Sequence, residues 1–288
     1  MRKFEILTDS GCDMPAEYLK QHGVFCALLG FTMDNVNYGE GGEKITEQEF
    51  YAKLRDGAMP TTYQVTGETA KEYLEGIVKT GKDVFVLTFS SALSGTSGSF
   101  TVAKRQLEKE YPDRKIVVVD SLCASMGQGL LLDYAIKKAD EGASIEETKE
   151  YVENLKLHIC HHFTVDNLFH LKRGGRVSAT TAIVGSILKI KPVLHVNNEG
   201  KLISIDKAMG RKKSLKMLAE RMFALEDITE DDPIFISHGD CLEDAQYVES
   251  LVRERFPKNE IKIAYIGAAI GTHSGCGTVA LFHKGKQR

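Results

Sequence analysis

The chain has 288 residues, of which 42% are hydrophobic and 27% are charged. This composition is ordinary for a soluble globular protein and suffices for one large or two ordinary domains. The net charge of −3 gives no global basic field, so we expect no nucleic-acid partner and at most transient membrane contact. Glu5 and Asp9 interrupt the apolar core that a signal peptide needs. Six scattered cysteines without a C-x-x-C pair favour free thiols and a cytoplasmic location.

Apolar runs and helical patterns alternate through the first half of the chain. We predict strands at 3–8, 24–33, 83–88 and 115–119, and a surface loop at 34–44. We predict helices near 16–21, 47–55, 67–79, 100–110, 126–141 and 144–157. This alternation favours a mainly parallel sheet flanked by helices. Since ligands of such sheets lie beyond the carboxyl ends of the strands, the polar turns after Thr8, Thr88 and Val119 should meet at one edge.

The second half has a different pattern and predicts an α/β unit with a mixed sheet. Its predicted strands are 162–165, 191–196, 201–208, 233–237, 260–266 and 278–283, and its predicted helices are 178–188, 211–224 and 241–255. We therefore predict an N-terminal domain, 1–157, and a C-terminal domain, 158–288. No low-complexity linker separates them, so the two should touch broadly.

Three polar segments are candidates for ligand binding. A turn rich in serine, threonine and glycine, 89–99, joins a predicted strand to a helix, where hydroxyls and unpaired backbone N–H groups can bind a carboxylate or phosphate. Within it, Ser94 could also serve only as a helix cap. The other two are the loop of Thr61 and Thr62 and the glycine-rich loop around His273. Hydroxyls and an imidazole can hold a carboxylate by hydrogen bonds, without a buried counter-charge.

Other combinations of residues are weaker. Ser94, His273 and Asp120 could be a hydrolase triad, but no G-x-S-x-G elbow surrounds the serine. A second group contains His158, Cys160, His161 and His162. Adjacent strand residues point to opposite faces, so these four cannot all bind one ion, and we predict no metal site. A basic glycine turn contains Lys172, Arg173 and Arg176; it could bind a phosphate or an acidic partner, or be a solvated loop.

Taken together, several short segments resemble the DegV family of bacterial fatty-acid-binding proteins. They are Thr8-Asp9-Ser10 with Asp13 and Pro15, Pro60-Thr61-Thr62 with Gln64, Ser90-Ser91 with Leu93-Ser94-Gly95-Thr96, Val119-Asp120-Ser121 with Ser125-Met126-Gly127-Gln128-Gly129, Leu171-Lys172-Arg173-Gly174-Gly175-Arg176, and Ile270-Gly271-Thr272-His273-Ser274-Gly275. Each is weak alone, but six in this order make the resemblance specific, and it runs from end to end of the chain.

The resemblance implies a two-domain, DegV-like α/β fold that holds a long-chain fatty acid (C14–C18, a range that includes palmitate) in a tunnel between the domains. Thr62 and Ser94 would meet the carboxylate, with Thr61 and Gly95 beside them and His273 near the head group. The family implies a carrier without a cofactor and without catalytic residues.

The resemblance also implies a role in lipid transport or in presenting the acid to a separate fatty acid kinase. Lys172, Arg173 and Arg176 are then candidates for the partner-facing surface. Two alternatives remain: a hydrolase or phosphotransferase that uses His273, and a binding protein for another small carboxylate or lipid.

The chain departs from the family pattern near the expected head group. Tyr63-Gln64-Val65 stand where Ser-Gln-Pro is usual, Ser97-Gly98 where Tyr-Gln is common, and Cys276 where proline is usual. These changes bear on acyl-chain preference more than on binding itself, because they leave Thr62, Ser94 and His273 in place.

Overall fold

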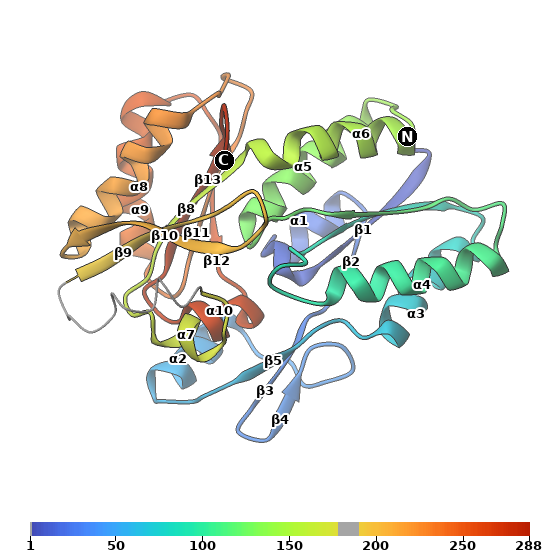
Figure 1. The fold of residues 1–288 in the computed structure, drawn as a ribbon, viewed down its shortest axis with the longest axis horizontal. Helices are drawn as coiled ribbons and strands as arrows, with labels where there is room; N and C mark the ends of the chain where they lie inside the picture. The colour runs from blue at the N-terminus through green and yellow to red at the C-terminus, as the bar shows by residue number, and fades with distance from the viewer. Residues whose placement is uncertain (1, 178–189) are drawn as a thin grey trace.

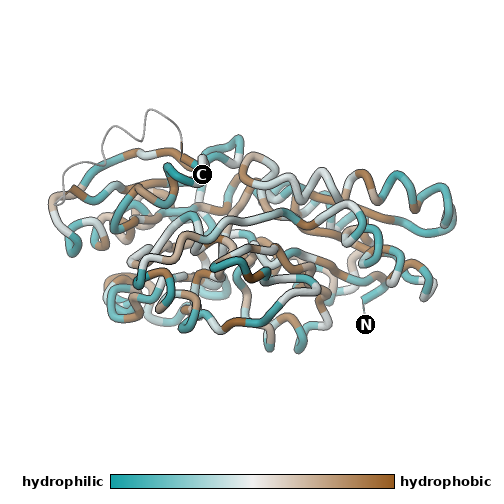
Figure 2. The backbone as a smooth tube through the Cα atoms, turned by 90° about the horizontal axis from the view of Figure 1, so that it is seen from below, coloured by the Kyte–Doolittle hydropathy of each residue, from teal (hydrophilic) through white to brown (hydrophobic). Residues whose placement is uncertain are grey.

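The protein is described by a computed structural model that covers residues 2–177 and 190–288. The helix predicted at 178–188 lies outside the described residues. Figure 1 shows two large sheets side by side, with a small sheet below them. In Figure 2 many of the outermost turns are hydrophilic. Among the described helices, none is both long and apolar enough to cross a bilayer.

The first large sheet is parallel, as predicted, with strand order β2-β1-β6-β7. Its strands are β1 (Phe4–Asp9), β2 (Val24–Ala27), β6 (Asp83–Thr88) and β7 (Ile116–Asp120). Helices α3 (Gly67–Val78) and α4 (Thr96–Glu110) pack on one face, and α1 (Ala16–Gln21), α5 (Met126–Asp140) and α6 (Ile145–Leu155) on the other. Successive β6 residues alternate between the two cores, Phe85 facing α5 and Val86 facing α3 and α4, because strand side chains alternate.

The second large sheet is mixed, with strand order β10-β9-β8-β13-β11-β12. Its strands are β8 (Ile159–Thr164), β9 (Ile190–Val196), β10 (Leu202–Met209), β11 (Ile234–His238), β12 (Ile261–Tyr265) and β13 (Val279–Lys284). The predicted hairpin is present as β9 and β10, and β11 and β12 pair in parallel. Helices α8 (Arg211–Leu225) and α9 (Leu242–Arg255) cover the face that carries Val193 and Leu281.

A third sheet, with order β4-β3-β5, corrects the prediction for residues 24–44. The expected single strand 24–33 divides into β2 and β3 (Gly30–Met33), and the expected loop contains β4 (Val36–Tyr38). Asp34 and Asn35 both have positive φ, 53° and 63°, which is the two-residue hairpin geometry that aspartate and asparagine tolerate. The third strand, β5 (Thr61–Tyr63), was predicted as a loop.

Two further segments predicted as loops are short helices. The glycine-rich segment around His273 forms α10 (Ala268–Ser274), and the basic turn contains α7 (Phe169–Arg173). Helix α10 and helix α2 (Glu47–Arg55) pack with the third sheet around Phe31, Phe50 and Tyr51. Residues from both halves therefore share this cluster, and the domain boundary at 157/158 stays a prediction.

Helix α5 lies between the two large sheets, and 12 of its 15 residues are buried. Its hydrophobic side chains share one core with Phe85 of the first sheet and Phe235 and Phe282 of the second. Gly127 permits the close approach, because a Cβ there would lie 2.2 Å from Nε2 of His161. The broad contact that the sequence suggested is formed largely by this helix.

Candidate ligand-binding site

The polar turns that follow β1, β6 and β7 meet at one edge of the first sheet, as predicted. Asp9 Oδ2 accepts a hydrogen bond from the backbone N–H of Phe89 at 2.7 Å, and Asp120 Oδ1 accepts one from Ser91 at 3.1 Å. Burial raises the pKa of Asp9 to about 6, although the hydrogen bonds from Phe89 and Gly11 oppose this effect. The carboxylates thus hold the serine-rich turn in place beyond the strand ends.

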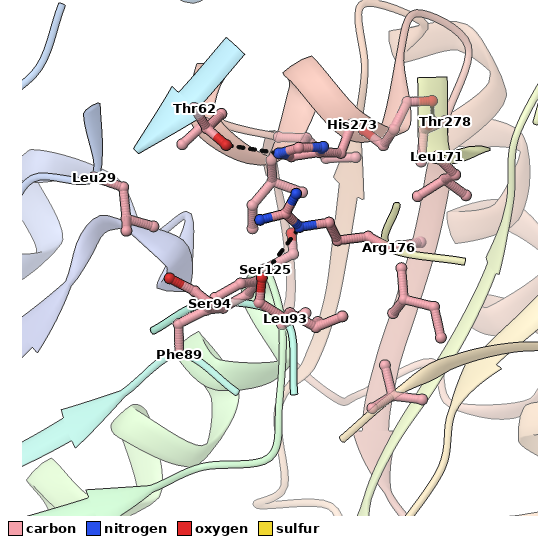
Figure 3. A pocket seen from close by; sticks show the side chains of 18 of the residues that line it. Leu29, Thr62, Phe89, Leu93, Ser94, Ser125, Leu171, Arg176, His273 and Thr278 are labelled. Atoms are coloured by element: carbon pink, nitrogen blue, oxygen red, sulfur yellow. Dashed lines mark hydrogen bonds between the residues drawn. The ribbon is translucent and has the colours of Figure 1, made fainter. Parts of the chain in front are cut away.

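A cavity of about 360 Å³ opens beside this edge, between the first sheet and the second. Much of its wall is apolar and comes from Phe163 on β8, Phe282 on β13, Val196 on β9 and Leu202 on β10. Its polar groups include Thr62, Ser94, Arg176 and His273 (Figure 3). A mostly apolar cavity with a few convergent polar groups is typical of a binding site for a small amphipathic molecule.

His273 and Thr62 form a hydrogen-bonded pair, with Nε2 and Oγ1 2.7 Å apart (Figure 3). Burial, with smaller contributions from Arg176 and Arg173, lowers the pKa of His273 to about 4, so the imidazole is neutral at neutral pH. Gly174 packs closely against the ring, since a Cβ there would lie 2.0 Å from Nδ1 of His273. Nδ1 is buried and has no partner within residues 2–177 and 190–288.

Ser94 sits just before α4, whose N-cap is Gly95. Its Oγ accepts from the backbone N–H of Thr96 at 3.3 Å and lies 3.0 Å from Thr96 Oγ1. Ser94 therefore supports the helix start and also lines the cavity. Gly95 lines it too, and a Cβ there would lie 2.0 Å from Oε1 of Gln64, so glycine keeps the two loops close.

Arg176 is part of the cavity wall, which the sequence did not indicate. Its Nε donates to the carbonyl of Leu93 at 3.2 Å and its Nη1 to that of Gly174 at 2.5 Å. Figure 3 shows the guanidinium between His273 and Ser94. No carboxylate of the described residues forms an ion pair with it. The site that was expected to be neutral thus contains a cation, and the sequence carried no signal for this beyond the presence of an arginine after two glycines.

The remaining predicted residues lie outside the cavity. Thr61 is exposed and is not among the residues that line the cavity, so its contact to the ligand stays a prediction. Lys172 is exposed on α7. Arg173 donates to the carbonyls of Pro60 and Thr272, at 2.9 and 3.5 Å, and so ties α7 to the loops of Thr62 and His273.

The possible catalytic triad is not assembled. Asp120 Oδ1 accepts from the backbone N–H groups of Ser91 and Leu122, and the hydroxyl of Ser94 is engaged with Thr96. The pair that does form, Thr62 with His273, lacks a described group on Nδ1 to orient the imidazole. An activated nucleophile normally needs both a base and a group that orients it.

A family model described as an uncharacterised protein of the DegV family matches residues 3–285. The chain belongs to the DegV family. A DegV domain-containing protein of Clostridium perfringens is 45% identical over 286 residues, which cover 99% of this chain and 98% of that protein. The resemblance drawn from the six short segments is therefore confirmed.

Solved structures share the fold over nearly the whole chain. The structure of a DegV family protein from Thermus thermophilus, described as fatty acid binding, is 29% identical with a TM-score of 0.88 and covers 99% of this chain and 100% of its own. A stearic acid-binding protein from Eubacterium ventriosum is 25% identical with a TM-score of 0.87, covering 98% of each chain. These likenesses confirm the predicted DegV-like α/β architecture.

Proposed function

We propose that this DegV protein binds a long-chain fatty acid in the cavity between its two large sheets. The observation that carries the proposal is the cavity itself, which joins an apolar wall to a cluster of two hydroxyls, a neutral imidazole and a guanidinium. The solved relatives from Thermus thermophilus and Eubacterium ventriosum, described as binding fatty acid and stearic acid, support it.

The chemistry of the wall matches the two ends of such a ligand. Ser94, Thr62 and Arg176 can donate to a carboxylate, and hydrogen bonds to an ionised group are about twice as strong as neutral ones. Phe163, Phe282 and Val196 offer apolar contact to the acyl chain, and each buried methylene contributes about 0.8 kcal/mol. C14–C18 acids are the expected ligands, and no cofactor is needed.

Native mass spectrometry of the purified protein should show a bound C14–C18 acid. After delipidation, Thr62→Val and Ser94→Ala should each weaken binding of palmitate by roughly 5- to 150-fold, because each removes one hydrogen bond of about 1–3 kcal/mol to a charged group. Thr61→Val is the matched control, since Thr61 lies on the same strand outside the cavity. Absence of any bound acid, with no binding after delipidation, contradicts the proposal.

We further propose that the protein acts as a carrier, without catalysing a reaction itself, and presents its acid to a fatty acid kinase. Arg173 supports this, since it donates to the loops of Thr62 and His273, and Lys172 is the exposed cation beside it on α7. With a fatty acid kinase and ATP, the loaded protein should yield acyl phosphate, and Lys172→Gln should lower the rate without changing acid affinity. Equal turnover of free acid with and without the protein contradicts this role.

A further inference from the structure

A cysteine and two histidines lie together on the face of β8 and β13 that points away from the cavity. The pairing register sets Cys160 opposite His283, with His162 two residues further along β8. One ligand atom from each residue lies within 4.8 Å of the other two, and all three residues are at most 2% exposed. We propose that Cys160, His162 and His283 bind a thiophilic d10 metal ion, Cu⁺ or Zn²⁺. The site is separate from fatty-acid binding and does not depend on it.

The sequence argument against a metal site applies to His161 but not to this cluster. His161 alternates with its neighbours and faces the cavity, whereas Cys160 and His162 share the opposite face. The third residue, His283, lies 121 positions after His162, so no local spacing could reveal it. A rigid pair of hydrogen-bonded strands now presents all three donors.

The hydrogen bonds around His283 prepare its Nε2 as a ligand. Its Nδ1 is 2.7 Å from the carbonyl oxygen of Lys284, and because a carbonyl only accepts, the proton of this imidazole lies on Nδ1. Its Nε2 lone pair then points at Nε2 of His162, 3.1 Å away. Two imidazole nitrogens on one tetrahedral ion lie about 3.3 Å apart, so these two nitrogens need to separate by only a few tenths of an ångström.

Binding requires the cluster to release one proton, that of the Cys160 thiol, because a thiolate is the form of cysteine that binds a metal. Binding forms a metal–sulfur bond and two metal–nitrogen bonds, the thiol proton passes to the solvent, and the proton on Nε2 of His162 moves to Nδ1.

The charge balance favours Cu⁺ over Zn²⁺. One thiolate neutralises a monovalent ion, whereas a divalent ion leaves a net positive charge in a buried site. The positive charges of Arg221 and Arg288 act on His162 and Cys160 and make that excess costly. Soft thiolate ligands select Cu⁺ and Zn²⁺ over harder ions.

The backbone of the neighbouring segment supplies a cover and a fourth donor. The carbonyl oxygen of Gln287 accepts from Cys160 Sγ at 3.1 Å, and it becomes free to coordinate once the thiol proton leaves. Gly285 lets the chain pass, because a Cβ there would lie 2.5 Å from Cys160 Sγ. Gln287 is exposed, so this strip of backbone separates the site from solvent on that side.

The test is a metal titration of the delipidated full chain after chelator and reductant treatment. Cu⁺ is delivered anaerobically from bicinchoninate, and Zn²⁺ from a chromophoric chelator, in separate arms. We expect one ion per chain in at least one arm, with affinity rising about tenfold per pH unit between pH 6.5 and 8, because one thiol proton is released. If neither ion binds at one per chain, the proposal is wrong, and His162 and His283 form only a hydrogen-bonded pair.

Matched variants locate the binding. Cys160→Ser and His283→Gln should each lower the affinity for the ion about 100-fold or more. The control is Cys241→Ser, which removes a half-buried free thiol elsewhere in the fold and should bind the ion as the parent does. If Cys160→Ser does not fold, the ion affinity of His283→Gln decides whether the proposal holds. Full affinity in His283→Gln assigns the ion to another site and overturns the proposal. Palmitate binding is measured on the same samples and should not change in any variant.

Discussion

At the residue scale, the polar end of the cavity depends on groups that come from four distant parts of the chain. Ser94 and Thr62 were predicted from hydroxyl-rich segments, and the structure places both in the wall with His273. Arg176 was assigned to a partner surface and instead lines the cavity. Sequence shows that an arginine follows two glycines, but not which way its side chain points. Gly175, with φ of +67°, turns the chain so that the guanidinium enters the cavity.

Arg176→Gln should weaken binding of a fatty acid roughly 10- to 150-fold, the effect of losing a charge-assisted hydrogen bond of about 1.5–3 kcal/mol. Binding of the matching fatty alcohol should change much less, because the alcohol carries no charge. Titration calorimetry with both ligands measures the difference. The control is Lys172→Gln, which removes an exposed cation four residues away from Arg176. Equal losses for acid and alcohol indicate that Arg176 only shapes the wall.

At the element scale, α5 determines how the two large sheets meet. Its pattern of hydrophobic residues predicted a helix, but the burial of 12 of its 15 residues follows from contact with both sheets at once. Gly127 approaches His161 of the second sheet, and Gly129 approaches the segment after β1, where a Cβ on Gly129 would lie 2.6 Å from Sδ of Met14. Two glycines in a helix, a cost in isolation, are here a requirement of packing.

Gly127→Ala should destabilise the protein by about 1–3 kcal/mol, because its Cβ would lie 2.2 Å from Nε2 of a buried imidazole, that of His161. Gly76→Ala is the matched control in α3, where nothing lies within 4 Å of the added Cβ. There the better helix propensity of alanine should stabilise by about 0.5–1 kcal/mol. Urea unfolding measures both. A neutral or stabilising Gly127→Ala contradicts the tight packing described for α5.

At the scale of the whole molecule, buried titratable groups set the dependence of stability on pH. Burial lowers the pKa of seven of the nine histidines: His161, His162, His170, His195, His238, His273 and His283. Two carboxyls act in the opposite sense, since burial raises the pKa of Asp9 to about 6 and of Asp13 to about 7. Asp13 also joins the two halves, by accepting from the backbone N–H of Gly267 at 3.0 Å and from the hydroxyl of Ser125 at 2.6 Å.

Stability should fall as the pH is lowered from 6.5 towards 4. In that range the unfolded chain protonates its histidines while the folded chain does not, so the unfolded state binds more protons. Asp9 and Asp13 oppose this loss of stability, but these two carboxyls are outnumbered by the seven histidines. Asp13→Asn removes one opposing group, so its loss of stability between pH 6.5 and 5 should be steeper than in the parent. Urea unfolding with a chelator present measures both slopes, and a flatter slope in Asp13→Asn contradicts the assignment.

The sequence alone was enough to predict the family and most helices and strands of the two large sheets, whereas β4, β5, α7 and α10 were predicted as loops. The successful predictions came from apolar runs, helical patterns and six short segments in order, which depend on neighbours along the chain. Three features could be seen only in the folded protein: the division of 24–33 between two sheets, the inward turn of Arg176, and the meeting of Cys160, His162 and His283. Each of these depends on which distant segments pack together, and side-chain direction at a site is fixed by that packing.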